Sequence, residues 1–388
     1  MRVLIAPDCF TGTLSAAEAA EAIADGWRRG APGDHLTVVP LSDGGPGFLD
    51  VLFRALGGVT VAVEVADPLG RPVPAVILMV DAGSRRTAYL ESAQACGLHL
   101  LAESERNPMI TSTFGVGQLL QAAVTHGATR VVLGLGGSGT NDGGAGLLAA
   151  LGAGDSDALT AGGARLRDLA ADGLQGLAAV QERLHGIEIV LATDVDSPLL
   201  GFHGASAVFA PQKGATPEMA QELESAIGRF ADVVARAAPG GRDLLTGRAM
   251  RLDREPGAGA SGGLGYGLLL LGGHRVSGVQ VVLDAVGFES LVASSDLIVT
   301  GEGTFDGQSL AGKVVSGVAQ AALASAKPVV VIAGQVLVGR RETMALGISG
   351  TYAVAEDPGQ VEAALAEPRS TLSARTTRVA MTWSPRHP

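Results

Sequence analysis

Short apolar runs alternate with alanine-rich stretches along most of this chain. The apolar runs have the length and the aliphatic composition of buried strands, and they occupy residues 3–6, 36–40, 59–65, 76–80, 87–91, 131–135, 188–192, 297–300, 329–333 and 350–354. The stretches between them favour helices. Such alternation is typical of an α/β fold built on a parallel sheet.

Two of the expected helices carry start signals. Ser15 and Glu18 have the spacing of a capping box, so a helix is expected to run from there towards Arg29. A second helix is expected to begin at Pro217 and to end before the two glycines at residues 240–241.

The strand pattern changes near residues 67–70. The sequence Asp-Pro-Leu-Gly there predicts a turn between two strands, and therefore a hairpin that leaves the first parallel sheet. Alternation of strand and helix returns at residue 297. We therefore predict a discontinuous domain formed by residues 1–65 plus 288–388, with a second α/β domain, residues 66–287, inserted into it. The segment from Pro368 onward lacks clear periodicity and is expected to fray.

Composition narrows the class of protein. Of the 388 residues, 47% are hydrophobic but only 4% are aromatic, so the core must be aliphatic. The net charge of −11 argues against a nucleic-acid partner, because a duplex binder needs a basic face. Glycine and charge interrupt every apolar run long before the roughly 20 residues of a membrane span, and the chain starts directly with a strand. We therefore expect a cytoplasmic protein without a membrane partner.

One glycine-rich loop is the clearest candidate for binding chemistry. It follows the apolar run 131–135, and its candidate ligand-binding residues are Gly136, Gly137, Ser138, Thr140, Asn141 and Asp142. Glycine lets several backbone N–H groups approach one anion closely, and a loop at the carboxyl end of a strand lies where α/β proteins bind ligands. The loop therefore predicts an anion-binding site.

Lysine is scarce in this chain, which makes its positions informative. Of the 28 basic residues only three are lysines, and two of these, Lys213 and Lys313, lie in glycine-flanked turns. A compact ammonium group contacts phosphate as a point charge where a planar guanidinium would not fit. We expect both to bind phosphate; the alternative is that they are ordinary surface lysines.

Acidic residues follow several predicted strands directly. Asp8 follows the first, the sequence Ser42-Asp43-Gly44-Gly45 follows the second, and Asp194 follows the strand at 188–192. Carboxylates at neighbouring strand ends could hold a metal ion or orient a hydroxyl group. Each of them could instead cap a turn or a helix.

Two further glycine-rich segments are candidates. Gly257 and Gly259 lie in the first, and the second, residues 301–309, contains Glu302, Asp306 and Ser309. Gly307, Gly312 and Lys313 have the spacing of a P-loop, but Val314 stands where a P-loop needs Ser or Thr. A Walker-type nucleotide site is therefore rejected, while Lys313 remains a phosphate-binding candidate.

Taken in order, these motifs resemble the glycerate kinase family. The matching stretches are residues 5–8, 14–16, 43–45, 136–138, 140–146, 194–195, 211–215, 256–260 and 301–303, followed by Asp306, Gln308, Ser309 and Lys313. The resemblance implies a Rossmann-like discontinuous domain, an inserted α/β domain and an active site in the cleft between them. It also implies transfer of the γ-phosphoryl group of ATP to D-glycerate, giving 2-phosphoglycerate, with Mg²⁺ as cofactor.

The resemblance suggests roles for particular residues. Asp43 or Asp194 would serve as general base or metal ligand, and Lys213 and Lys313 would bind phosphates. Family members commonly carry Lys, Glu, Arg and Arg at the positions of Thr11, Pro46, Phe114 and Thr304, so three cations are missing here. Open alternatives are therefore a kinase for another small hydroxy acid or a polyol, and an inactive binding or sensor module. A monomer and a homodimer are both compatible with the sequence.

Overall fold

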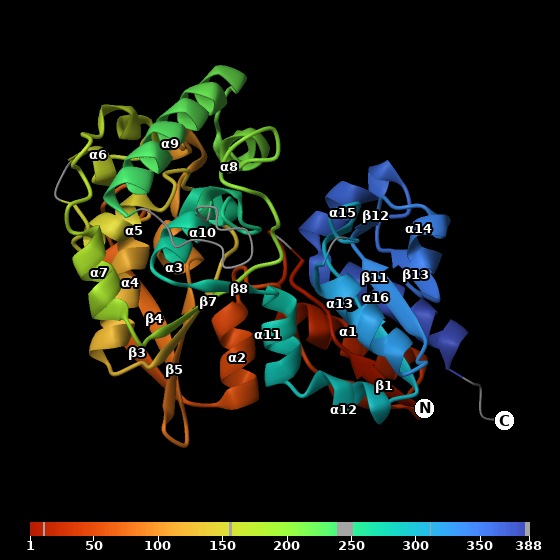
Figure 1. The fold of residues 1–388 in the computed structure, drawn as a ribbon. Coiled ribbons are helices and arrows are strands. Elements are labelled where there is room, and N and C mark those ends of the chain that lie inside the picture. Colours follow the sequence, from red (N-terminus) through yellow and green to blue (C-terminus); the bar gives the residue numbers. More distant parts are fainter. Residues whose placement is uncertain (11, 155–156, 239–250, 311, 385–388) are drawn as a thin grey trace. The chain divides into compact units, whose positions relative to one another are not determined.

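The chain divides into two compact units in the computed structural model (Figure 1). The structure describes residues 1–10, 12–154, 157–238, 251–310 and 312–384. Unit 1 comprises residues 1–43, 50–56 and 279–388, and unit 2 comprises residues 44–49 and 57–278. Thr11, one of the departures from the family pattern, lies outside the described residues.

Unit 1 is built on a parallel sheet. In the order in which they pair, its strands are β13 (Gly350–Ala353), β11 (Val329–Ala333), β9 (Leu297–Thr300), β1 (Arg2–Ile5) and β2 (His35–Val38). All were predicted from their aliphatic runs. The side chains of β9 and β11 are buried throughout, as expected for a parallel sheet covered on both faces.

Helices surround this sheet. They are α1 (Ala16–Gly30), α2 (Phe48–Leu56, from Asp50 onward in this unit), α11 (Gly278–Ala285), α12 (Phe288–Ala293), α13 (Val314–Ala324), α14 (Arg340–Ala345), α15 (Val361–Ala366) and α16 (Pro368–Trp383). Trp27 of α1 is fully buried in the core together with Ile5 and Ile332. A short pair, β10 (Thr304–Phe305) and β12 (Gln335–Val336), was not predicted, because two residues carry no recognisable pattern.

The prediction that the chain frays from Pro368 was wrong. Residues 368–383 form α16, which lies along α1, and small residues allow the close approach. A Cβ atom added at Gly26 would overlap the carbonyl oxygen of Ser373, and one added at Gly30 would overlap that of Thr377. The helix was missed because its buried face mixes Leu372, Val379 and Ala380 with Ser and Thr, which weakens the apolar stripe that marks an amphipathic helix.

This close approach predicts the effect of one methyl group. Gly26→Ala should destabilise the protein by about 1–3 kcal/mol, because the added Cβ forces α16 away from α1. The matched control is Gly228→Ala, also within a helix, where an added Cβ meets nothing within 4 Å. That substitution should stabilise by about 0.5–1 kcal/mol through helix propensity. Urea unfolding of both variants measures whether each change lowers or raises the free energy of unfolding. A neutral or stabilising Gly26→Ala would contradict the close packing of α1 on α16.

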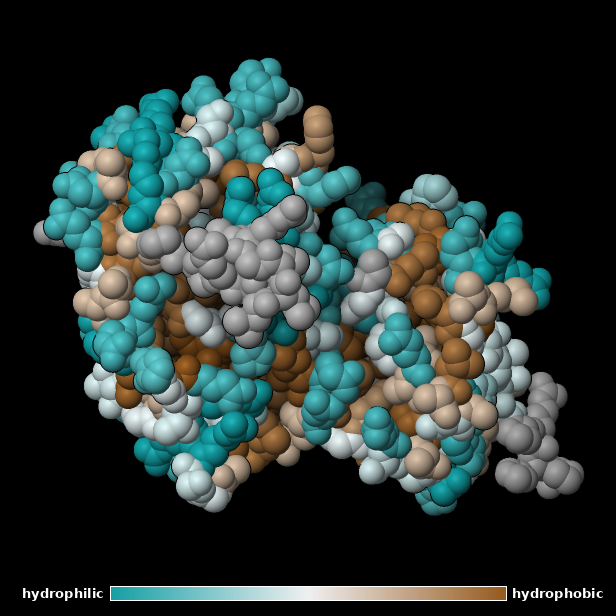
Figure 2. Space-filling view, viewed as in Figure 1, coloured by the Kyte–Doolittle hydropathy of each residue, from teal (hydrophilic) through white to brown (hydrophobic). Residues whose placement is uncertain are grey.

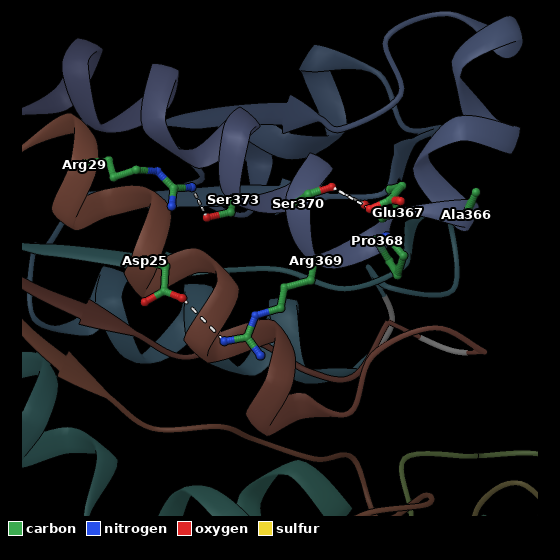
Figure 3. Close-up of a pocket in the computed structure, with 8 residues that line it drawn as sticks. All are labelled: Asp25, Arg29, Ala366, Glu367, Pro368, Arg369, Ser370 and Ser373. Carbon is green, nitrogen blue, oxygen red and sulfur yellow. Dashed lines mark hydrogen bonds and ion pairs between the residues drawn. The ribbon is translucent and has the colours of Figure 1, made fainter.

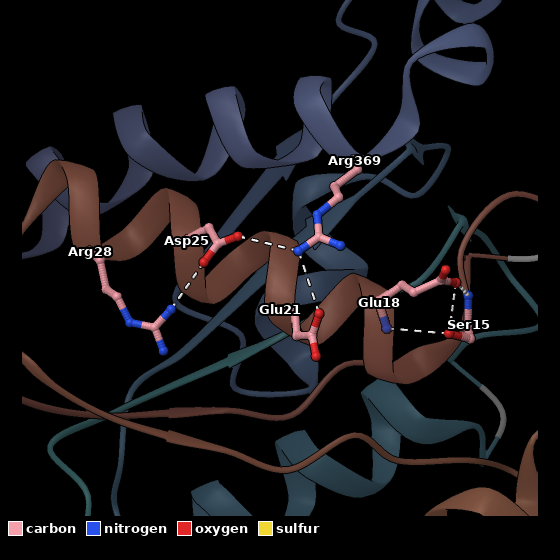
Figure 4. Close-up of polar contacts among 6 residues, drawn as sticks. All are labelled: Ser15, Glu18, Glu21, Asp25, Arg28 and Arg369. Atoms are coloured by element: carbon pink, nitrogen blue, oxygen red, sulfur yellow. Dashed lines mark hydrogen bonds and ion pairs between the residues drawn. The ribbon is translucent and has the colours of Figure 1, made fainter.

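Polar contacts on the outer side of α1 are secondary to this packing. The predicted capping box is present, with Glu18 N–H donating to Ser15 Oγ at 3.3 Å and Ser15 N–H donating to Glu18 Oε2 at 2.9 Å (Figure 4). Arg369 of α16 lies 3.4 Å from both Glu21 and Asp25. Exposed ion pairs of this kind contribute little to stability.

A surface pocket opens between α1 and the start of α16. Its volume is about 480 Å³, and Asp25, Arg29 and Arg369 lie on its walls (Figure 3). The Arg29 guanidinium donates to Ser373 Oγ. None of the predicted site residues lines this pocket.

Unit 2 is built on a mixed sheet. Its strands pair in the order β3 (Val59–Ala66), β4 (Pro72–Ala82), β5 (Arg85–Glu91), β6 (Arg130–Gly134), β7 (Glu188–Ala192) and β8 (His274–Val276). The predicted hairpin is confirmed, since β3 and β4 are antiparallel, and β5 to β8 are parallel. β3, which the sequence analysis assigned to the first domain, pairs within unit 2. The short β8 was not predicted.

Helices pack on this sheet around a second aliphatic core. They are α3 (Ala93–Cys96), α4 (Phe114–Thr125), α5 (Ala145–Ala150), α6 (Asp157–Thr160), α7 (Leu177–Leu184), α8 (Ala205–Phe209), α9 (Pro217–Ala237) and α10 (Ala260–Leu270). α9 starts at Pro217 as predicted and buries Leu223, Ile227 and Phe230, while its outer surface is hydrophilic (Figure 2). Residues 240–241, expected to end it, lie outside the described residues. No helix in the described part of the chain is long and apolar enough to cross a membrane.

Candidate active site

Three carboxylates of unit 1 follow three neighbouring parallel strands. Asp8 follows β1, Asp43 follows β2 and Glu302 follows β9, and β1 pairs with both of the other strands. The backbone holds these strand ends together, because Asp8 N–H donates to Gly301 O at 2.8 Å. The acidic residues at strand ends therefore gather at the carboxyl edge of the sheet, as the sequence predicted for Asp8 and Asp43.

Burial and mutual repulsion make this group electrostatically unusual. Glu302 is 7% exposed, and its Oε1 atom has no hydrogen-bond partner. Burial raises the pKa of Glu302 to about 7, with smaller upward contributions from Asp306 and Asp43, while a hydrogen bond from Ser309 and the charge of Lys313 lower it. Burial, then the carboxylate of Asp43, raises the pKa of Asp8 well above its usual range. The cluster therefore favours a cation or a proton.

The loop between β9 and α13 brings further predicted residues to this edge. Asp306 accepts hydrogen bonds from the backbone of Gln308, at 2.8 Å, and of Ser309, at 3.3 Å, so it shapes the loop. Lys313 is half-buried and directly precedes α13. β10 interrupts the path from β9 to α13, which agrees with rejecting a P-loop. Ser42 is buried beside Asp43 in the sequence. Unit 1 thus holds Asp8, Ser42, Asp43, Glu302, Asp306, Ser309 and Lys313.

The remaining predicted residues belong to unit 2. They are Gly44, Gly45, Gly136, Gly137, Ser138, Thr140, Asn141, Asp142, Asp194, Lys213, Gly257 and Gly259. The main glycine loop follows β6, and Asp194 follows the neighbouring β7, so both lie at the carboxyl edge of the parallel part of the sheet. Gly137 is exposed, whereas Ser138 to Asp142 are buried.

The carboxylate of Asp142 is engaged in hydrogen bonds within the protein. Its carboxylate accepts hydrogen bonds from Thr113 N–H at 2.8 Å, from Gly144 N–H at 3.1 Å and from Gly146 N–H at 3.2 Å, and also from the Thr113 hydroxyl. Burial raises its pKa, and these hydrogen bonds act in the opposite direction. Asp142 therefore fixes the loop rather than facing a ligand.

Lys213 is not a surface lysine. Its side chain is 2% exposed, and its Nζ donates to Ser138 Oγ at 2.9 Å and to Thr140 O at 2.6 Å. Burial lowers its pKa to about 8, although the nearby Cys96 and Asp142 act to raise it. Beside it, Thr140 Oγ1 and Asn141 Oδ1 are buried without a hydrogen-bond partner, while Asn141 Nδ2 donates to Ser206 Oγ at 3.0 Å.

Several glycines that were expected to approach phosphate are needed for internal packing instead. A Cβ atom added at Gly136 would lie 2.6 Å from Gly45 Cα, and one added at Gly257 would lie 2.9 Å from Arg275 Cδ. At Gly259 it would overlap the carbonyl oxygen of Pro198. A residue without a side chain suits both close internal packing and close approach to a phosphate group, so the sequence alone could not distinguish these two roles. Gly137, at φ +66° and exposed, remains free to present its backbone to a ligand.

Comparison with known proteins decides the family. The model of the glycerate kinase family matches residues 3–384. The chain belongs to this family. A glycerate kinase of Bacillus subtilis (strain 168) is 42% identical over 366 residues, covering 93% of this chain and 91% of that protein. A glycerate 2-kinase of Escherichia coli (strain K12) is 37% identical over 371 residues, covering 94% of this chain and 93% of that protein. The crystal structure of a provisionally assigned glycerate kinase 2 from Salmonella typhimurium LT2 has a TM-score of 0.74 and 37% identity, covering 98% of each chain.

Membership of the glycerate kinase family makes the chain a phosphotransferase. Its departures from the family pattern are placed as follows. Pro46 and Thr304 are exposed, and Phe114 is half-buried at the first position of α4. None of these three side chains can carry a charge.

The sequence analysis missed three residues that hold the segments carrying the candidate residues of unit 2. Glu91 is the last residue of β5, and its carboxylate accepts from Gly47 N–H at 3.1 Å and from Leu49 N–H at 3.3 Å, which ties residues 44–49 to the rest of unit 2. Thr113 holds Asp142. Arg275 donates to Thr193 O at 3.2 Å and pairs with Asp196 at 2.8 Å. Glu91 could have been found, because it is an acid at the end of a strand; Thr113 and Arg275 carry no comparable signal.

Proposed function

We propose that this chain catalyses ATP-dependent phosphorylation of D-glycerate to 2-phosphoglycerate. The family membership supports a glycerate kinase, and the name of the Escherichia coli relative supports the 2-position. The observation that carries the proposal is the group of Asp8, Asp43 and Glu302 at one sheet edge, with Lys313 close enough to lower the pKa of Glu302. Such a group suits phosphoryl transfer, which depends on positioning and on charge stabilisation.

Magnesium fits the chemistry of this acidic group. Carboxylates that repel one another, and a buried Glu302 Oε1 without a partner, are what a bound cation would stabilise. Within the described residues no three His, Cys, Asp or Glu side chains are placed to hold a metal ion on their own. We therefore infer that Asp43 or Asp194 would supply only part of the ligand set, with phosphate oxygens and water supplying the rest. Bound Mg²⁺ neutralises developing charge on the phosphates.

The chain's own residues would divide the remaining work. One carboxylate, Asp43 or Asp194, accepts the proton of the substrate hydroxyl. Lys313 binds phosphate oxygens as a point charge. In unit 2, the exposed backbone of Gly137 and the unpartnered Thr140 Oγ1 and Asn141 Oδ1 would contact nucleotide or substrate.

An ADP-release assay tests this function. Purified protein with MgATP is expected to release ADP with D-glycerate, and to do so more slowly with L-glycerate, glycolate or glycerol. The carboxylate and both hydroxyl groups of D-glycerate are then recognised together. Equal rates with glycerol would contradict the proposal, because a polyol lacks the carboxylate.

A kinase for another small hydroxy acid or a polyol is the second candidate. It is favoured by one observation: Pro46, Phe114 and Thr304 are uncharged where family members commonly carry charged side chains. Each lost contact between arginine and a carboxylate is worth about 1.5–3 kcal/mol. Turnover by another member of the panel would support this candidate, whereas no turnover across the panel would support a module that only binds.

A further inference from the structure

Lys213 presents a problem of charge burial. Its ammonium group is almost completely removed from solvent, and within the described residues no carboxylate lies within ion-pair distance of it. The nearby carboxylate of Asp142 already accepts from Thr113, Gly144 and Gly146. Burying an ammonium is costly unless its N–H groups are hydrogen-bonded. The partners it does have should therefore explain why it is there.

Those partners are two points of the main glycine loop. Ser138 Oγ and Thr140 O lie on either side of Gly139, and both accept from Lys213 Nζ, at 2.9 Å and 2.6 Å. Gly139 itself is held differently, since its N–H donates to Cys96 O at 2.7 Å and its carbonyl oxygen accepts from Thr111 Oγ1 at 2.9 Å. The backbone already bridges Ser138 to Gly97, so the contacts of Lys213 add a side-chain restraint to this turn and extend it to Thr140.

The third anchored point is Gly137. Its carbonyl oxygen accepts from Leu98 N–H at 2.8 Å, which fixes the peptide that joins Gly137 to Ser138. Gly137 is the exposed end of the segment that Lys213 holds. Because Ser138 is the next residue along the chain, its contact with Lys213 also limits how the exposed backbone at Gly137 can turn.

We infer that Lys213 is a positioning residue that locks the turn from Ser138 to Thr140. The locked turn preorganises the end of the loop, at Gly136 and Gly137, to bind an anionic group of the substrates. The inference rests on the proposed function for the identity of that group. Two of the three N–H donors of Lys213 are used inside the protein, so it acts through the loop and not as a phosphate ligand. The lowered pKa of about 8 agrees with an ammonium held by neutral acceptors.

Hydrogen exchange of the ligand-free protein tests the inference directly. Lys213→Met keeps the length of the side chain and removes the donors. Amides of residues 137–140 should then exchange about tenfold faster or more, since hydrogen bonds to charged groups hold the loop closed. Amides of β6 should exchange at the wild-type rate. Lys327→Met, which removes a lysine of unit 1, is the matched control and should leave the loop unchanged. Unchanged exchange in Lys213→Met would overturn the inference.

Ser138→Ala keeps the test available if Lys213→Met does not fold. It removes one of the two acceptors and should also accelerate exchange at residues 137–140. In a double-mutant cycle each single variant should raise KM for ATP, and the double variant should raise it no further than the larger single effect. Additive effects on KM with unchanged exchange would instead indicate direct contact of Lys213 with phosphate, and would overturn the inference. The exchange experiment needs no substrate, so its result does not depend on whether the protein turns over D-glycerate. The ADP-release assay tests the proposed function separately.

Discussion

Replacing Glu302 with glutamine is expected to raise the free energy of unfolding at pH 8 and to leave it almost unchanged at pH 4.5. The folded-state pKa of Glu302 is about 7, above its ordinary value of 4.5. The contribution of the protonated Glu302 carboxyl group to the free energy of unfolding is therefore fully present below pH 4.5 and is lost as the pH rises through 7. Glutamine avoids this loss, so the gain at pH 8 should be on the order of 3 kcal/mol.

Urea unfolding across this pH range, in buffer with a metal chelator, measures the effect. Glu289→Gln on α12 is the matched control, because Glu289 is exposed and should show no comparable pH dependence. The Glu302→Gln variant should also turn over more slowly, since removal of one charge weakens the acidic group. A variant less stable than wild type at pH 8 would show that Glu302 is held by a favourable partner, contrary to its unpartnered Oε1.

Asp43→Asn is expected to lower kcat by about 10²- to 10⁴-fold while leaving the fold intact, as loss of a general base or of a metal ligand does. Asparagine keeps the volume of aspartate and removes its charge. Because the carboxylate of Asp43 helps to raise the pKa of Glu302, the variant should also shift the pH at which Glu302 loses its proton to lower values.

Two measurements check this prediction together. Steady-state kinetics give kcat, and the pH profile of urea unfolding gives the titration of Glu302. Asp50→Asn on the exposed side of α2 is the control and should change neither. Wild-type turnover by Asp43→Asn would leave Asp194 as the candidate base, and an unshifted pH profile would contradict the electrostatic link between Asp43 and Glu302.

Much of the fold could be predicted because buried parallel strands have an unmistakable composition. β9 and β11 are aliphatic throughout, since both faces of the sheet are covered. The missing elements lack such a signal. β8, β10 and β12 have two or three residues each, and α16 meets α1 through Ser373 and Thr377 facing two glycines. A helix whose buried face mixes apolar residues with Ser and Thr carries only a weak periodic signal.

The site was predicted in part for a similar reason. An acid after a strand reaches the carboxyl edge of a parallel sheet, and Asp8 and Asp43 lie at that edge as expected; Glu91, the last residue of β5, carries a related signal. Burial is not written in the sequence. Lys213 was singled out by its scarcity, but its internal contacts with Ser138 and Thr140 depend on how the chain folds back after α8. The hydrogen bonds of Asp142 with Thr113, Gly144 and Gly146 likewise depend on the fold and carry no signal in the sequence.

Identification of the product tests the central claim most directly. After incubation of the purified protein with MgATP and D-glycerate, proton and phosphorus NMR assign the phosphorylated carbon. The account predicts stoichiometric formation of ADP and 2-phosphoglycerate, with coupling of phosphorus to the single proton on C2. Coupling to the two protons on C3, or recovery of unmodified D-glycerate from protein shown to be folded, would contradict it.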